Sequence, residues 1–308
     1  MLTHITIPRG PIQLAADLYL PDATTPTATI TTDRAAVVLS TPGSSVKEQI
    51  GANYASRLAA RGLAAVVFDP AHQGRSGGLP RDLEDPYRRS EDISYVIDAL
   101  GALPGIDPHR IGVLGICAGG GYAVHAARTD HRIKAVGTVV ASDVGAAFRG
   151  FTPDGPAAAL DTLATARLGE SRTGEELRTT WLPDTLADAA AAGLTDIDTT
   201  QAVTYYRTDR GHSEYSTNRR LTRSDSLILG FDAYHLVDQL MTQPLQVILA
   251  GRRGNTGSYE SGMRLWELAP GADDLMVIDG AGHYEMYDVP EYVDAAVGRL
   301  LEFYSRHL

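Results

Sequence analysis

The sequence predicts an α/β fold, in which a mostly parallel β-sheet is covered by helices on both faces. Short apolar segments alternate with amphipathic segments along most of the chain. Two of the apolar segments, Ala35–Ser40 (AAVVLS) and Ala64–Asp69 (AAVVFD), are almost continuously apolar, as strands buried on both faces are. A third, IGVLGI at residues 111–116, runs directly into a glycine-rich turn and a helix-like segment. Strands that alternate with helices in this way form a parallel sheet.

The expected elements follow in order along the chain. The first two strands, Leu2–Ile7 and Ile12–Tyr19, are predicted to pair with each other. The alternation then predicts, from N- to C-terminus, strand 35–40, helix 47–61, strand 64–69, helix 85–103, strand 111–116, helix 119–128 and strand 134–141. It resumes later with strand 245–250, helix 259–268, strand 274–278 and helix 290–307, the last with proline in its first turn.

Residues 143–240 interrupt the alternation. They are rich in Ala, Thr and Asp, with helical patterns at 156–168 and 184–192. Loops at the carboxyl ends of parallel strands form the binding site, so we predict that this insertion is a lid over the site rather than a separate domain. The predicted α/β core therefore consists of residues 1–142 and 241–308.

Composition narrows the class of protein. The chain has 308 residues, of which 44% are hydrophobic and 21% charged, which is typical of a folded globular chain. The net charge of −11, without a basic run, argues against nucleic acids and anionic membranes as partners. No run of 18 apolar residues and no secretory pattern at the N-terminus is found, so we expect a cytoplasmic protein. Histidine spacing predicts no zinc site, and we expect neither metal nor cofactor.

Cys117, the single cysteine, lies in the glycine-rich turn and forms the motif Gly115-x-Cys117-x-Gly119. Small residues must flank the centre of such a sharp strand-to-helix turn, because larger side chains would collide with neighbouring elements. The central side chain then stands above the sheet at the positive end of the following helix. We interpret Cys117 as a nucleophile; the alternative is a small buried apolar residue, as most free cysteines are.

His283 is the predicted base, because it directly follows the last expected strand and this architecture orders nucleophile, acid and histidine along the chain. The acid is expected after strand 245–250, where no Asp or Glu occurs before Glu260. Asn255 is our candidate for that position. A cysteine–histidine pair can rest as thiolate and imidazolium, so a neutral Asn can be enough to orient the ring. The alternatives are an acid from elsewhere, such as Asp232, and a site that has lost hydrolysis.

Two further groups of residues are candidates for the site. The oxyanion hole is expected to use the backbone amides of Ala118 and of Ser44 or Ser45, which lie in the loop after strand 35–40. Within the insertion, a short segment concentrates aromatic rings and arginines suited to an acyl substrate with oxygen-bearing ends. These residues are Tyr205, Tyr206, Arg207 and Arg210. A structural bridge between lid and core is the alternative role for them.

With these motifs in hand, the chain resembles the α/β-hydrolases, and within them the dienelactone-hydrolase-like branch. Several segments are similar to a bacterial and fungal group that includes thiohydrolases. They are residues 41–49, 68–78, 111–123, 205–211, 231–235 and 278–288. The resemblance implies a Ser or Cys nucleophile, a late His and an Asp; the chain departs from it at Asn255 and at Thr41, where a His is expected. It also implies that a glutamate near the oxyanion loop contacts the thiol, which makes Glu48 a candidate; a surface charge is the alternative.

The expected function is acyl hydrolysis of a thioester, ester or lactone through Cys117 and His283, in a setting such as natural-product biosynthesis. One alternative is non-hydrolytic acyl chemistry, as in a cyclase or acyltransferase, on the same covalent intermediate. The other is a non-catalytic small-molecule binder on a hydrolase scaffold. The expected partner is a small acyl substrate, free or bound to a carrier protein, and a homodimer is compatible with the sequence.

Overall fold

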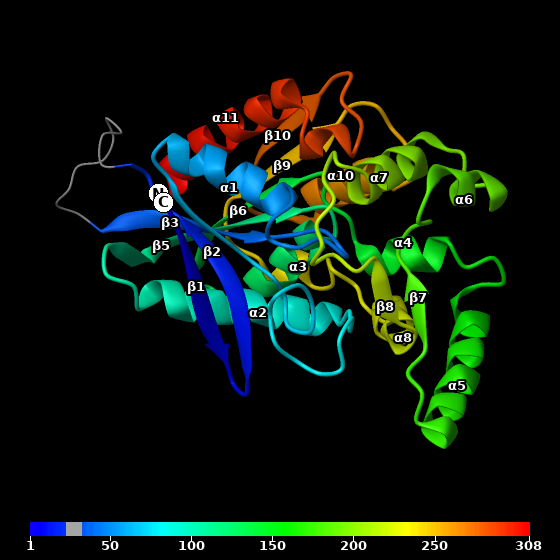
Figure 1. The fold of residues 1–308 in the computed structure, drawn as a ribbon. Helices are drawn as coiled ribbons and strands as arrows, with labels where there is room; N and C mark the ends of the chain where they lie inside the picture. Colours follow the sequence, from blue (N-terminus) through cyan, green and yellow to red (C-terminus); the bar gives the residue numbers. More distant parts are fainter. Residues whose placement is uncertain (23–32) are drawn as a thin grey trace.

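The computed structural model describes residues 1–22 and 33–308. Its centre is an eight-stranded sheet with the strand order β1-β2-β4-β3-β5-β6-β9-β10 (Figure 1). The strands are β1 (Leu2–Arg9), β2 (Ile12–Tyr19), β3 (Arg34–Ser40), β4 (Ala64–Phe68), β5 (Ile106–Ile116), β6 (Ile133–Val139), β9 (Leu245–Ala250) and β10 (Ala272–Ile278). The β1–β2 hairpin joins the sheet antiparallel to β4, and the strands from β4 to β10 run parallel. This confirms the predicted fold class.

Helices cover both faces of the sheet (Figure 1). One face carries α1 (Ile50–Ala60) and α11 (Pro290–His307); the other carries α2 (Pro86–Gly101), α3 (Ala118–Ala127) and α10 (Ser258–Leu268). Successive strand residues point to opposite faces, so Val37 belongs to the core under α1 and Val38 to the core under α2. This is why the central strands are apolar at every position.

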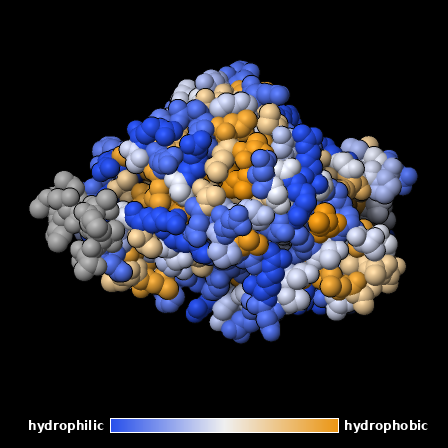
Figure 2. Space-filling model, turned by 90° about the horizontal axis from the view of Figure 1, so that it is seen from above, coloured by the Kyte–Doolittle hydropathy of each residue, from blue (hydrophilic) through white to orange (hydrophobic). Residues whose placement is uncertain are grey.

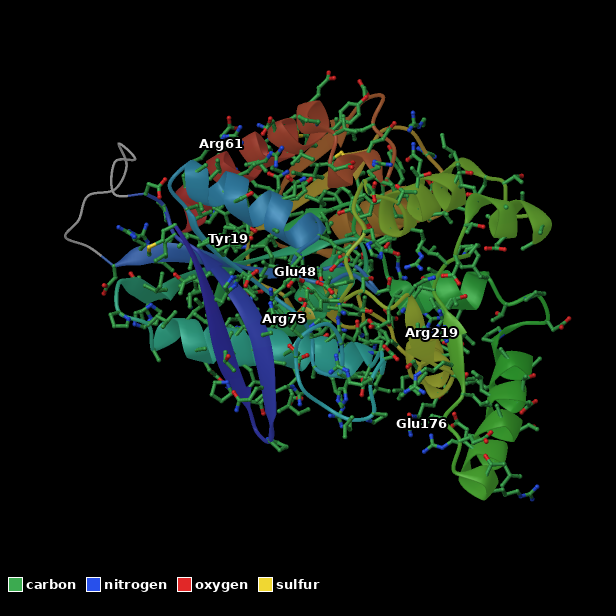
Figure 3. All side chains as sticks on the ribbon, in the orientation of Figure 1. Tyr19, Glu48, Arg61, Arg75, Glu176 and Arg219 are labelled. Carbon is green, nitrogen blue, oxygen red and sulfur yellow. The ribbon has the colours of Figure 1, made fainter. Side chains whose placement is uncertain are left out.

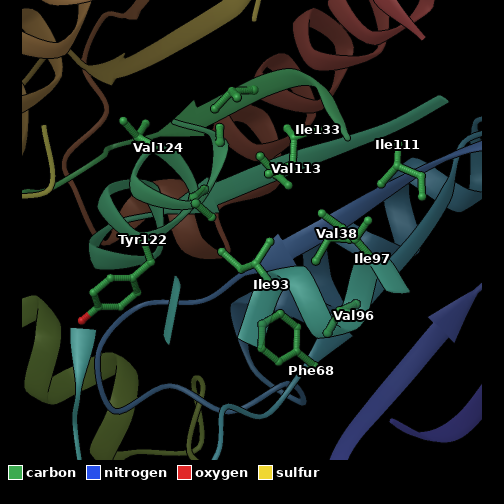
Figure 4. Close-up of a cluster of buried hydrophobic side chains, with 14 of the residues drawn as sticks. Val38, Phe68, Ile93, Val96, Ile97, Ile111, Val113, Tyr122, Val124 and Ile133 are labelled. Carbon is green, nitrogen blue, oxygen red and sulfur yellow. The ribbon is translucent and has the colours of Figure 1, made fainter. Parts of the chain in front are cut away.

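Figure 4 shows part of the core on the α2 and α3 side. Ile93, Val96 and Ile97 of α2 lie in the same buried cluster as Val38 and Val113 of the sheet, all of them at most 2% exposed. Spacings of three and four residues place these α2 side chains on one helix face. Each buried aliphatic side chain of this kind contributes roughly 1.5–3 kcal/mol.

The 143–240 insertion forms small elements between β6 and β9. They are α4 (Val144–Gly150), α5 (Pro156–Thr173), β7 (Arg178–Thr180), α6 (Leu186–Ala191), α7 (Ile197–Arg207), β8 (Arg219–Leu221), α8 (Arg223–Leu229) and α9 (Val237–Leu240). Both predicted helical segments are present, as α5 and α6. The remaining elements were not predicted, because they are short and their apolar residues do not repeat at a clear helical period. Helix α5 has no buried residue and extends from the side of the molecule (Figure 1).

The face seen from above is mostly hydrophilic, with apolar residues in separate patches (Figure 2). Large apolar side chains that are exposed include Leu79, at 84%, and Phe151, at 64%. Across the described ranges, no helix combines the length and the apolar composition needed to span a membrane.

Candidate active site

Cys117 occupies a strained turn between β5 and α3. Its backbone has φ 55° and ψ −126°, a conformation that L-residues rarely adopt. The glycines on either side are required by close packing: a Cβ at Gly115 would lie 2.4 Å from the carbonyl oxygen of Gly119. A Cβ at Gly119 would lie 2.1 Å from the carbonyl oxygen of Ser40. Strand, turn and helix are therefore packed backbone against backbone, and Cys117 stands at the N-terminus of α3.

The Cys117 thiol is a neutral group in this environment. Burial raises the pKa of the thiol, and hydrogen bonding by the Tyr287 hydroxyl and the Ala118 N–H, together with the positive charge of Arg89, acts in the opposite direction. The net direction is upward, because desolvation of a thiolate is the largest of these effects. The Ala118 N–H and the Tyr287 hydroxyl nevertheless both lie close to the sulfur atom.

His283 is 2% exposed and lies in the loop after β10. Its Nδ1 is 2.9 Å from the Ser258 Oγ, and its Nε2 is 3.2 Å from the Tyr287 hydroxyl oxygen. Tyr287 is thus a neighbour of both groups: its hydroxyl acts to lower the pKa of the thiol and lies within hydrogen-bond distance of the imidazole. Burial without a neighbouring carboxylate lowers the pKa of His283 to about 3. Both shifts favour the neutral thiol and the neutral imidazole over a thiolate–imidazolium pair.

Asn255, our candidate to orient His283, lies elsewhere; the partner of Nδ1 is Ser258, in the first turn of α10. The Asn255 side chain hydrogen-bonds to Asp196 in the insertion. The neighbouring Thr256 N–H donates to Asp198 at 2.9 Å, so two carboxylates at the start of α7 hold this loop. The sequence could not show this, because α7 is far from the loop along the chain.

Asp232, the alternative acid, does not contact His283 either. Its carboxylate accepts a hydrogen bond from the Tyr234 N–H at 3.0 Å and lies near Arg128. Arg128 follows the last residue of α3, whereas Cys117 precedes its first. Over residues 1–22 and 33–308, no carboxylate is hydrogen-bonded to the His283 ring.

Aromatic rings surround the Cys117–His283 pair. The Tyr205 ring contacts those of Tyr206 and Tyr287 edge-to-face, with centroids 4.9 and 5.1 Å apart. The rings of Tyr284 and His283 lie 4.7 Å apart. Tyr205 and Tyr206 are 3% and 5% exposed, so the insertion contributes buried rings directly beside the candidate catalytic residues.

The arginines of the same segment serve a structural purpose. Arg210 forms a bidentate ion pair with Asp288 at 2.6 and 2.7 Å and donates to the carbonyl of Tyr284. This pair joins the insertion to the loop that carries His283. Arg207 pairs with Asp184 within the insertion, at 3.1 Å. Arg210 therefore makes the lid-to-core bridge that was the alternative to substrate binding, whereas the Arg207 pair stays inside the insertion.

The loop after β3 carries the expected oxyanion donors. The Ser45 N–H closes a turn onto the Pro42 carbonyl at 3.2 Å, whereas the Ser44 N–H has no hydrogen-bond partner within the described residues. Ser44 has φ 61°, a left-handed backbone conformation that residues other than glycine rarely adopt. These turns also explain why α1 begins at Ile50 and not at the predicted Lys47. Ser44 is therefore the better oxyanion candidate of the two serines.

The insertion packs onto this same loop. The Ser216 hydroxyl donates to the Ser44 carbonyl at 2.7 Å. A Cβ on Gly43 would meet the Trp181 ring at 3.1 Å, so that ring lies directly against the loop. The Gln49 side chain donates to the Gly211 carbonyl at 2.6 Å. Contacts from separate parts of the insertion thus hold the oxyanion loop in place.

Glu48 does not contact the thiol. Its carboxylate pairs with Lys47 at 2.6 Å, and Lys47 also pairs with Asp17 of β2 at 3.0 Å. Figure 3 labels Glu48 near the start of α1. The expectation that the resemblance raised is wrong here, because the buried Lys47 ammonium attracts this carboxylate.

A buried network behind the loop was not predicted. Arg89 of α2, 4% exposed, donates to the carbonyls of Thr41 and Pro42 at 2.6 and 3.2 Å. Its guanidinium lies 4.8 Å from the centroid of the Tyr122 ring and 3.6 Å from the fully buried Glu84. Glu84 in turn accepts a hydrogen bond from the Tyr122 hydroxyl at 2.6 Å. No local sequence pattern predicts that the charged side chain of Arg89 is buried and supports the oxyanion loop.

Comparison with known proteins agrees with this fold. The model of the alpha/beta hydrolase family matches residues 41–296, and the chain belongs to that family. The uncharacterized protein YcjY of Escherichia coli is 36% identical over 299 residues, covering 96% of this chain and 95% of that protein. The hypothetical protein PA2218 of Pseudomonas aeruginosa is 30% identical over 305 residues, covering 96% of this chain and 78% of that protein. Its crystal structure has a TM-score of 0.87 and 27% identity to this chain, and covers 100% of this chain and 94% of that one.

A shorter part of the chain matches a protein whose name states an activity. The thiohydrolase aneE of Aspergillus aculeatus is 32% identical over 125 residues, which cover 41% of this chain and 36% of that protein.

Proposed function

We propose that this chain is an acyl hydrolase in which Cys117 attacks a thioester, ester or lactone and His283 acts as the base. The strained Cys117 turn is the observation that carries the proposal, because backbone strain of this kind is maintained where a side chain must be presented to a substrate. The partial likeness to the thiohydrolase aneE and the resemblance to the dienelactone-hydrolase-like branch support a role on acyl chains of the natural-product kind.

Nucleophilic attack requires removal of the thiol proton. The Tyr287 hydroxyl passes its own proton to His283 Nε2 as it accepts the proton of Cys117. The sulfur lone pair forms a bond to the carbonyl carbon, and the C=O π electrons move onto oxygen. The oxyanion then accepts hydrogen bonds from the N–H groups of Ala118 and Ser44. When the tetrahedral adduct collapses, the bond to the leaving group breaks and the leaving group takes the proton held on His283.

The imidazolium formed in this step needs stabilisation without a carboxylate partner. The Ser258 Oγ can accept a hydrogen bond from Nδ1–H and thereby hold the ring in the tautomer that leaves Nε2 free as a base. The electron-rich ring of Tyr284, 4.7 Å away, favours a cation at this position. Hydrolysis of the acyl-enzyme repeats the cycle with water as the nucleophile.

The enclosed site also favours a second candidate function. His283 is 2% exposed, and buried tyrosine rings surround it. Restricted access of water lengthens the life of an acyl-enzyme, so an internal hydroxyl or a second substrate can take the acyl group, as in a cyclase or an acyltransferase. The missing carboxylate is the feature that favours the remaining alternative, a non-catalytic binder.

Intact-protein mass spectrometry with a panel of acyl-N-acetylcysteamine thioesters tests the proposal. We expect an acyl adduct on the native chain and none on Cys117→Ala. Decay of the adduct to free acid supports hydrolysis, and decay to a cyclised or transferred product supports the second function. If neither an adduct nor a product forms from thioesters, esters or lactones, both the hydrolase and the acyl-transfer proposals are overturned. The non-catalytic small-molecule binder is then the alternative that remains.

A further inference from the structure

One pocket of the molecule is lined by neither Cys117 nor His283, and the proposed reaction does not use it. Its volume is about 720 Å³, and it lies between the β1–β2 hairpin, the loop from His72 to Leu83, the start of α2 and the helices α5 and α8. Apolar side chains form part of the wall, namely Pro11, Ile12, Leu79, Pro80, Leu83 and Leu227.

The remaining wall holds three arginines and one carboxylate, Asp85, although the chain as a whole carries a net charge of −11. Arg88, Arg167 and Arg223 line the pocket. Arg88 pairs with Asp85 at 3.2 Å and Arg223 with Glu176 at 3.1 Å; Glu176 is labelled in Figure 3. Arg167 has no ion-pair partner among the residues that the structure describes. The guanidinium groups therefore outnumber the carboxylates that neutralise them.

His72 provides an independent indication of a ligand. It is 4% exposed and lines the same pocket, with its Nδ1 3.0 Å from the Pro80 carbonyl oxygen. A carbonyl only accepts, so Nδ1 carries the proton and Nε2 has a free lone pair. That buried Nε2 has no hydrogen-bond partner in the described chain. Burial and nearby arginines lower the pKa of His72, so Nε2 stays an acceptor at neutral pH.

We infer that this pocket binds a phosphate monoester with an apolar body. The arginines provide charge-assisted donors for the phosphoryl oxygens, and the apolar wall accommodates the body of the ligand. Nε2 of His72 is buried, so the ligand must displace the atoms that cover it; the P–O–H group of the monoanion then donates to Nε2, which a carboxylate cannot do. The start of α2 contributes Arg88 to the wall, whereas the Asp85 carboxylate caps the N-terminus of that helix by accepting from the Tyr87 and Arg88 N–H groups.

Calorimetric titration at pH 6.5 tests this assignment with octyl phosphate, octanoate and octanol as probes. We expect octyl phosphate to bind about tenfold more tightly than octanoate, and octanol not to bind. Arg167→Gln and Arg223→Gln should each weaken octyl phosphate binding about tenfold, the usual effect of one charge-assisted hydrogen bond. His72→Asn keeps a donor for the Pro80 carbonyl but removes Nε2, so it should abolish the preference for phosphate over carboxylate.

Two controls separate this pocket from the Cys117 site and from general charge effects. Arg172→Gln removes a positive charge from the same helix as Arg167 but outside the pocket, and should change the affinity less than about twofold. Cys117→Ala should bind octyl phosphate as the native chain does. No binding by the native chain, equal binding of octanol, or unchanged binding by the Arg167 and Arg223 variants would overturn the inference. Equal affinity for octanoate would overturn the phosphate assignment.

Discussion

Gly119→Ala tests the packing that places Cys117 above the sheet. The added Cβ would lie 2.1 Å from the Ser40 carbonyl oxygen, 2.5 Å from its carbon and 2.7 Å from the Thr41 carbonyl oxygen. These are backbone atoms, so no side-chain rotation can relieve the overlap. Contact at about 3 Å requires the start of α3 to move away from β3 by close to an ångström. Overpacking of this kind costs about 1–3 kcal/mol, and so large an overlap places the cost near the upper end.

The matched control is Gly298→Ala in α11, where the new Cβ meets nothing within 4 Å. Alanine is favoured over glycine inside a helix by about 1 kcal/mol, so this variant should be more stable than the native chain by up to that amount. Urea unfolding at 25 °C compares the two free energies, and we expect a difference of about 3–4 kcal/mol between the variants. A Gly119→Ala chain within about 0.5 kcal/mol of the native one would refute the close-packing argument.

Three further predictions concern the proposed reaction. Ser258→Ala should lower the acylation rate more than Asn255→Ala, because Ser258 is bonded to His283; equal effects in the adduct assay would contradict this. Tyr287→Phe should slow acylation by about 10²–10⁴, the usual contribution of a proton-transfer group, with substrate binding nearly unchanged; an unaltered rate would exclude the Tyr287 relay. Because burial raises the pKa of Cys117, the thiolate fraction at neutral pH is low, and iodoacetamide alkylation should accelerate about tenfold per pH unit up to pH 9; fast, pH-independent alkylation would restore the ion-pair model.

Part of the site could be predicted from the sequence, because the residues that specify it are close together in the chain. The apolar run before Cys117 and the glycines around it specify a strand, a tight turn and a helix within a few residues. Periodicity likewise predicted the strands and long helices of the core, which bury large, regular faces. The insertion was less predictable because its short elements bury irregular surfaces, and α5 buries none.

Ser258 illustrates what could not be foreseen. Asn255 and Ser258 are three positions apart in the sequence, and nothing there distinguishes which side chain turns toward His283. Carboxylates from α7 hold the Asn255 loop and leave Ser258 at the ring. Arg210 likewise pairs with Asp288, which lies 78 residues further along the chain and is brought near only by folding.

The sequence by itself determined the α/β class, most of the strand and helix boundaries in the core and the position of Cys117 at a sharp turn, because these depend on contacts between near neighbours in the chain. The tertiary structure decided which side chains and backbone groups the site residues contact. Ser258 and His283 are 25 residues apart, Asp198 and Thr256 are 58 apart, and Gln49 and Gly211 are 162 apart. Hydrogen bonds and ion pairs over such separations are set by the relative positions of whole elements, which no local pattern encodes.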